Sequence, residues 1–182
     1  MPILKKEVDI FPEHLLENTL GYDSVWLFSL MSRREKDFMR RLFKMGIAFY
    51  GPVFEKRFRS PNGRFRTSYS PLFPSYVFVF GNEQDRYEAM KTNCVSSYIE
   101  IANAEQLVKD LRQIQAVLSS GVAVTQEEKL ASGDLVYVIN GPFKGFEGKV
   151  IRRESQTRLL VFVHFIEQGV SMEIDQSQLK SL

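Results

Sequence analysis

The 182-residue sequence contains one cysteine, Cys94, and two histidines, His14 and His164. A single thiol forms no internal disulfide, which is typical of proteins in a reducing compartment. Two histidines so far apart do not form a zinc-like ligand set, and no Gly-x-Ser-x-Gly turn is present to carry a hydrolase nucleophile. We therefore predict a protein that is not an enzyme, with no catalytic residue, no metal and no cofactor.

Long hydrophobic runs are also missing. No stretch reaches the roughly 18 to 20 apolar residues that cross a bilayer, and the N-terminal segment lacks the apolar centre of a signal peptide. Hydrophobic residues make up 44% and charged residues 25% of the chain, as in soluble globular proteins. We expect a cytoplasmic monomer without a membrane partner.

The charge is nearly balanced overall, with a formal net charge of +2, but it is uneven along the chain. Residues 21–118 carry 15 basic and 10 acidic side chains, a net of +5. Residues 121–182 carry 7 basic and 8 acidic side chains, a net of −1. The middle of the chain is therefore the part best suited to nucleic acid, although a solvated surface explains an excess of this size as well.

Helix and strand patterns alternate through residues 21–118. Strands are predicted at 25–30, 47–50, 76–80 and 95–101, and helices at about 32–45, 83–91 and 104–118. Ser32 and Glu35 form a capping-box pattern at the start of the first helix, which is expected to end at Gly46. The pattern indicates an α+β fold, with helices packed on an antiparallel sheet.

Residues 55–70, EKRFRSPNGRFRTSYS, predict a β-hairpin whose turn is Pro61-Asn62-Gly63. Its strands carry Phe58 and Phe65 between basic side chains. The basic residues are Lys56, Arg57, Arg59, Arg64 and Arg66. These cations suit phosphate contacts, which do not depend on nucleotide sequence. A solvated surface is the alternative that remains open.

The segment GPFKGFEGKV, residues 141–150, has the glycines and lysines of a phosphate-binding loop, but not their order. Gly148-Lys149 is followed by Val150 where the phosphate loop needs a hydroxyl residue, and a strand follows where it needs a helix. A turn between two strands fits better. In this interpretation Gly141 turns the chain, Gly145 adopts a positive φ, Gly148 allows close backbone approach, and Lys144 stays in solvent.

Four short strands with glycine-rich turns predict a small SH3-like β-barrel near the end of the chain. They are expected at residues 134–140, 149–153, 159–166 and 171–174. The predicted organisation is an N-terminal arm (1–20), an α/β sandwich (21–118), a linker (119–131) and the barrel (132–182). The apolar residues of the arm are expected to dock on the body: Ile10, Phe11, Leu15 and Leu16.

Two segments resemble one known family. GDLVYVINGPFKGFEGKV resembles the KOW motif of NusG-family transcription elongation and antitermination factors, and SPLFPSYVFVF (70–80) is similar to the Phe-Pro-Gly-Tyr-Val segment of their N-terminal (NGN) domain. The resemblance covers residues 24–182. Ser75 stands where housekeeping members have Gly, a form more similar to RfaH-like specialised paralogues. KOW modules also occur in ribosomal proteins, so a ribosome-associated or RNA-binding KOW protein is the alternative.

The resemblance implies a set of partners and contact residues. The NGN-like domain would bind the β′ clamp helices of bacterial RNA polymerase through Trp26, Phe73, Pro74 and Tyr76. Of these, we expect Trp26 to lie in the core or in the floor of the site, and Phe73, which precedes a proline at the entrance of a strand, to be the exposed anchor. Arg33 and Arg34 would meet the non-template DNA strand. The KOW domain would bind Rho or ribosomal protein NusE through Ile166, with Phe165 beside it. Neighbours on a strand point in opposite directions, so only one of those two is expected to make the contact.

Overall fold

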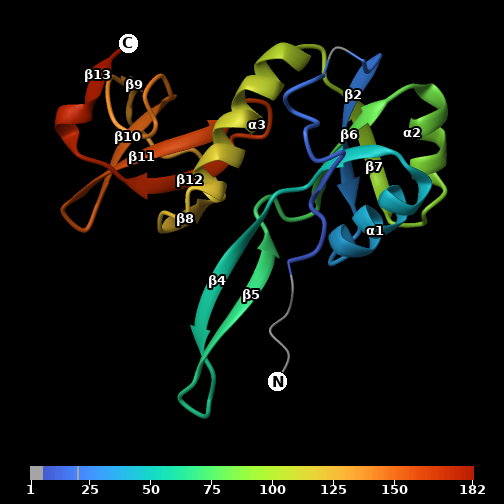
Figure 1. The fold of residues 1–182 in the computed structure, drawn as a ribbon, viewed down its shortest axis with the longest axis horizontal. Coiled ribbons are helices and arrows are strands. Elements are labelled where there is room, and N and C mark those ends of the chain that lie inside the picture. The colour runs from blue at the N-terminus through green and yellow to red at the C-terminus, as the bar shows by residue number, and fades with distance from the viewer. Residues whose placement is uncertain (1–5, 20) are drawn as a thin grey trace. The chain divides into compact units, whose positions relative to one another are not determined.

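The structure is a computed structural model that describes residues 6–19 and 21–182. The chain divides into two compact units, residues 1–104 and 105–182. Figure 1 shows the fold and labels most of its helices and strands. No helix in the described ranges is both long enough and apolar enough to cross a membrane.

The first unit is an α+β domain, as predicted. Its elements are β1 (Ile10–Phe11), β2 (Ser24–Leu30), α1 (Glu35–Met45), β3 (Ala48–Tyr50), β4 (Val53–Arg59), β5 (Phe65–Pro71), β6 (Tyr76–Gly81), α2 (Glu83–Met90) and β7 (Val95–Glu100). Five strands form an antiparallel sheet in the order β1-β3-β6-β2-β7. β4 and β5 pair only with each other and extend away from that sheet (Figure 1).

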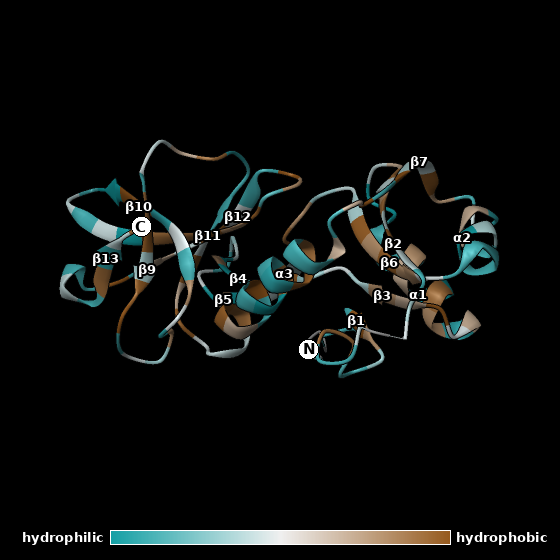
Figure 2. Ribbon diagram, turned by 90° about the horizontal axis from the view of Figure 1, so that it is seen from above, coloured by the Kyte–Doolittle hydropathy of each residue, from teal (hydrophilic) through white to brown (hydrophobic). Residues whose placement is uncertain are grey.

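The core of this unit lies between the sheet and α1. Trp26 and Phe28 on β2 point to the same face because side chains alternate along a strand, and both are fully buried. Phe38 and Leu42, four residues apart on α1, pack in the same cluster. In Figure 2 the inner strands β2 and β6 are coloured as hydrophobic, whereas helix α2 is largely hydrophilic.

The start of α1 differs from the prediction. The helix begins at Glu35, its N-cap is Arg34, and no side chain caps it. Arg33 has a φ of 61°, a left-handed conformation that interrupts the helical path after Ser32. The capping box predicted for Ser32 and Glu35 is therefore wrong. The predicted end of the helix is confirmed, because Gly46 is left-handed with a φ of 70°.

The N-terminal arm is part of the first unit rather than an appendage. Strand β1 extends the sheet by pairing Ile10 with Tyr50 and Phe11 with Phe49. Leu15 and Leu16 are each only 1% exposed. The expected docking of the arm's apolar residues is confirmed for these positions, while residues 1–5 and 20 of the predicted arm lie outside the described residues.

The second unit is a small antiparallel β-domain preceded by a helix. Its elements are α3 (Ala104–Ser119), β8 (Val124–Glu127), β9 (Asp134–Val138), β10 (Glu147–Arg153), β11 (Gln156–Val163), β12 (Gln168–Glu173), a 3-10 turn (Gln176–Gln178) and β13 (Leu179–Ser181). The six strands are ordered β13-β9-β10-β11-β12-β8. The four predicted strands correspond to β9 to β12, whereas β8 and β13 were not predicted.

The division of the chain lies earlier than the predicted linker at residues 119–131. Strand β8 falls inside that segment and pairs with β12, and its Glu127 is 5% exposed. The Glu127 carboxylate accepts hydrogen bonds from Ser171 Oγ at 2.7 Å and Arg153 Nη2 at 2.6 Å. Hydrogen bonds from these two partners offset the free-energy cost of burying the carboxylate. The polar segment that was predicted to be a linker therefore contains a strand. Helix α3, predicted to close the first domain, groups with the second unit.

Candidate partner-binding and nucleic-acid-binding surfaces

The turn between β5 and β6 holds the residues expected to meet a protein partner. Phe73 is only 1% exposed, and its ring lies edge-on to Phe78 at 6.1 Å. The turn folds back on itself, because the Tyr76 N–H donates to the Phe73 carbonyl at 3.0 Å. The prediction that Phe73 is an exposed anchor is therefore wrong. Trp26 is also 1% exposed and lies in the core, as expected for that residue.

The accessible part of this turn is Pro74, which is exposed, and Tyr76, which is half-buried. Tyr76 lies opposite Ser29 on β2, and Ser29 lies opposite Ser97 on β7. Residues opposite one another share a face of the sheet. Ile99 lies two residues after Ser97 on β7, so its side chain is on the same face. Ile99 is 52% exposed. Small serines thus separate Tyr76 from an exposed aliphatic side chain on one face.

Ser75 fixes the shape of the same turn. Its φ is 66°, a left-handed conformation that non-glycine residues seldom adopt. The Ser75 N–H donates to Glu35 Oε1 at 2.8 Å, and its carbonyl accepts from the Leu30 N–H at 2.8 Å. Glu35 is 7% exposed, so the carboxylate that failed to cap α1 anchors this turn instead.

Arg33 and Arg34 are both exposed, but their electrostatic surroundings differ. Arg34 Nη1 lies 3.3 Å from Asp37 Oδ2, and Arg41 Nε lies 3.2 Å from Asp37 Oδ1. The Arg41 hydrogen bond holds the pKa of Asp37 below its ordinary value, so this carboxylate is ionised at neutral pH and offsets part of the positive charge. Within the described ranges Arg33 has no carboxylate partner, which leaves it better placed for a phosphate.

The β4–β5 hairpin forms as predicted. Its turn closes with hydrogen bonds from Ser60 N–H to the Arg64 carbonyl and from Gly63 N–H to the Ser60 carbonyl, each 2.8 Å long. Gly63 has a φ of 76°. The hairpin is exposed from 55 to 59 and from 61 to 66, so all five predicted phosphate-binding cations are accessible.

The turn between β9 and β10 also agrees with its prediction. Gly141 and Gly145 have φ values of 84° and 87°, and the Gly145 N–H donates to the Val138 carbonyl at 2.8 Å. A Cβ on Gly148 would collide with the Leu160 carbonyl oxygen of the neighbouring strand. The glycines therefore serve two adjacent strands, and Lys144 is exposed.

Phe165 and Ile166 lie in the turn between β11 and β12 rather than within a strand. Phe165 is 46% exposed and Ile166 is half-buried. The expectation that only one of them makes the contact assumed the alternation of a strand, which the turn does not follow. Both side chains are accessible at this edge of the β-domain.

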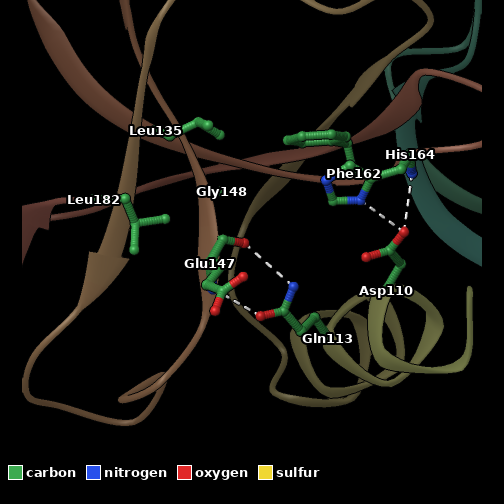
Figure 3. Close-up of a pocket in the computed structure, with 8 residues that line it drawn as sticks. All are labelled: Asp110, Gln113, Leu135, Glu147, Gly148, Phe162, His164 and Leu182. Atoms are coloured by element: carbon green, nitrogen blue, oxygen red, sulfur yellow. Dashed lines mark hydrogen bonds and ion pairs between the residues drawn. The ribbon is translucent and has the colours of Figure 1, made fainter. Parts of the chain in front are cut away.

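Helix α3 forms a polar contact with the β-domain that the sequence interpretation missed (Figure 3). Asp110 Oδ2 lies 2.9 Å from the His164 backbone nitrogen, which donates to it, and 2.9 Å from His164 Nδ1. The Gln113 amide exchanges hydrogen bonds with the Glu147 backbone, at 2.8 Å and 3.2 Å. Asp110 and Gln113 are 2% and 8% exposed, and buried polar side chains need such partners. The sequence signal that could have predicted this contact is the position of Asp110 and Gln113 on the apolar side of an amphipathic helix.

The described residues hold no group of three or more His, Cys, Asp or Glu side chains arranged to bind a metal ion. Cys94 is 1% exposed, and burial raises the pKa of its thiol. A buried thiol with a raised pKa is a poor nucleophile at neutral pH.

Comparison with known proteins identifies one segment. Residues 132–164, which include the whole of β9, β10 and β11, match the family model of the KOW motif. The second unit carries a KOW motif. The motif predicted from GDLVYVINGPFKGFEGKV is thereby confirmed, and we refer to β8–β13 as the KOW domain. A comparison with curated proteins gives no match.

Solved structures that match this chain include two that cover most of its length. One is described as "Domain interaction in Thermotoga maritima NusG"; it has 19% sequence identity, covers 87% of this chain and 97% of that chain, and has a TM-score of 0.44. The other is the MjSpt4:Spt5 complex, with 20% identity, coverage of 87% of this chain and 96% of that chain, and a TM-score of 0.27.

Proposed function

We propose that this protein is a NusG-type transcription elongation or antitermination factor. Its first unit would bind RNA polymerase, and its KOW domain would bind a second protein. The observation that carries the proposal is the KOW motif at residues 132–164, preceded by an α+β unit whose β5–β6 turn keeps Pro74 and Tyr76 accessible. No catalytic step is part of this function.

The proposed polymerase contact is the surface formed by Pro74, Tyr76 and Ile99, and its target is the β′ clamp helices. Support comes from the accessibility of Pro74 and Tyr76 at the β5–β6 turn, and from the Ser29 and Ser97 positions that lie between Tyr76 and Ile99 on one face of the sheet. Aromatic side chains at partly buried positions commonly contribute much of an interface's energy. Binding there would suppress pausing by holding the clamp closed.

Arg33, Arg34 and the basic side chains of the hairpin would contact the phosphates of the non-template DNA strand. Support comes from their exposure and from the absence, in the described part of the chain, of a carboxylate beside Arg33. The KOW domain would use Phe165 and Ile166 to bind Rho or ribosomal protein NusE. Support comes from the joint accessibility of these two apolar side chains in one turn.

The polymerase contact is tested by Tyr76→Ala in a quantitative pull-down with core RNA polymerase. Loss of a central aromatic contact should weaken binding by about 1–2 kcal/mol, on the order of tenfold. The matched control is Tyr87→Ala, because Tyr87 lies on α2 of the same unit and is 53% exposed. Equal affinity of wild-type protein and Tyr76→Ala would refute the role of this surface.

A ribosome-associated or RNA-binding KOW protein is the second candidate, because a KOW motif alone names no partner. Fractionation of a lysate containing tagged protein separates the two candidates. Co-sedimentation with RNA polymerase supports the elongation factor. Co-sedimentation with ribosomal particles, unaffected by Tyr76→Ala, supports the alternative.

A further inference from the structure

We infer that the β4–β5 hairpin is a stacking platform for single-stranded nucleic acid, in which Phe58 and Phe65 contact bases while the neighbouring arginines contact phosphates. The inference deepens the proposed function and rests on its nucleic-acid contact. The ligand chemistry is an unpaired polynucleotide, which in a transcription complex is supplied by the non-template DNA strand or by the transcript.

The register of the hairpin places one exposed phenylalanine ring on each of its faces. Phe58 lies directly opposite Arg66, and Arg59 lies directly opposite Phe65. Residues directly opposite each other share a face, with Cβ atoms about 4.5–5.5 Å apart. Each face therefore places an exposed apolar ring directly opposite a guanidinium, the two groups that suit a nucleotide's base and phosphate.

The two rings do not contribute to a core. Phe65 is 79% exposed and Phe58 is 48% exposed, on a ladder whose strands pair only with each other. In the free protein Phe65 therefore keeps most of its apolar surface, and Phe58 about half of its own, available for a ligand. Other aromatic residues of the first unit, such as Phe49 and Phe78, are fully buried.

The charge around the rings selects a polyanion. Residues 55–70 carry five basic side chains and one acidic side chain, a net of +4. Glu55 is paired with Arg57 at 3.1 Å, and Arg59 Nε donates to the Gly63 carbonyl at 3.3 Å. Arg64 and Arg66 have no carboxylate partner within the described ranges, so their charges are available to phosphates.

The two exposed rings favour a single-stranded nucleic acid over a duplex or an acidic protein surface. Stacking on an aromatic side chain is open to every base, because each base has a π-face, and it is largely independent of sequence. A duplex keeps those faces inside its own stack, and an acidic protein surface does not offer a row of them. A nucleic acid with unpaired bases can contact both the phenylalanine rings, through its bases, and the arginines, through its phosphates.

The test is fluorescence anisotropy with the full chain and four short labelled oligonucleotides of equal length. These are oligothymidylate, oligouridylate, an abasic DNA strand that keeps the phosphates without the bases, and a DNA duplex. Phe65→Ala should weaken binding of oligothymidylate by about fivefold or more and leave binding of the abasic strand unchanged. Arg66→Ala should weaken both and reduce the salt dependence by roughly one phosphate contact.

The matched control is Tyr87→Ala, which removes an exposed ring that lies 4.5 Å from Lys91 Nζ, but on helix α2. It should leave all four affinities unchanged. Circular dichroism should show the same fold for every variant, because the substituted side chains are exposed. Tighter binding of the DNA or of the RNA strand supports the inference and identifies the source of the ligand.

Three results would overturn the inference. If Phe65→Ala and Phe58→Ala bind all strands like the wild type while Arg66→Ala is weakened, the hairpin contacts phosphates only. If both phenylalanine variants lose duplex binding as much as single-strand binding, the rings do not stack on unpaired bases. If the wild type binds no strand, the hairpin's nucleic-acid role in the proposed function fails too, while the Tyr76→Ala pull-down still judges the polymerase contact independently.

Discussion

Two segments of the first unit look alike in sequence and differ in structure. Both the β5–β6 turn and the β4–β5 hairpin place a phenylalanine within a few residues of a proline. Phe73 in the turn is 1% exposed, whereas Phe65 in the hairpin is 79% exposed. The aromatic content of a segment therefore does not tell whether its rings stabilise the fold or meet a partner.

The cause of the difference is what each segment's strands pair with. The β5–β6 turn leads into β6, an inner strand held between β3 and β2, so Phe73 packs against Phe78 of that strand. Among the described residues the hairpin strands pair only with each other, and residues 55–59 and 61–66 are exposed to solvent. Two-stranded ribbons cannot bury their own side chains, because no third element covers them.

The largest expected difference in the free energy of unfolding is between the variants that truncate Phe73 and Phe65. Phe73→Ala should lower the free energy of unfolding by about 3–5 kcal/mol, because it leaves a cavity beside Phe78. Phe65→Ala should change it by no more than about 0.5 kcal/mol, because the ring is exposed. Urea unfolding of the two variants measures both. Equal destabilisation by the two substitutions would remove the distinction between these segments.

A smaller change in the free energy of unfolding is expected from substitutions at two residues that have a left-handed backbone conformation. Ser75 and Gly63 have φ values of 66° and 76°. Ser75→Gly should stabilise the protein by about 0.5 kcal/mol, since relief of strain exceeds the added entropy of the unfolded chain. Gly63→Ala should destabilise it by about 1 kcal/mol. Thermal unfolding of both variants provides the comparison, and a shift of the same sign in both would contradict it.

Much of the fold was predictable because its signals are local. Gly46, Gly141 and Gly145 mark conformations that other residues seldom adopt, and the sequence places each of them at a turn or a helix end. The hairpin follows from Pro61-Asn62-Gly63 between β-prone strands. The KOW domain was predicted for the same reason, since its motif is built around such a turn.

The errors arose where a distant residue decides the outcome. Glu35 fits a capping box with Ser32, but its carboxylate binds the Ser75 N–H, 40 residues away. Asp110 lies in a helix that was assigned to the first domain, and it bonds to His164, 54 residues away. Phe73 was expected to be exposed because a proline follows it, and its burial depends on Phe78 across the turn. Single-sequence patterns do not report such pairings.

The most direct test of the account is photocrosslinking in a reconstituted RNA polymerase elongation complex, with benzoylphenylalanine replacing Tyr76 in one protein and Phe65 in another. Both positions already hold accessible aromatic rings, so the replacement preserves the surface. The account predicts that position 76 crosslinks to a polymerase subunit and that position 65 crosslinks to DNA or RNA. Crosslinking of neither position to the complex, or of position 65 to polypeptide alone, would contradict it.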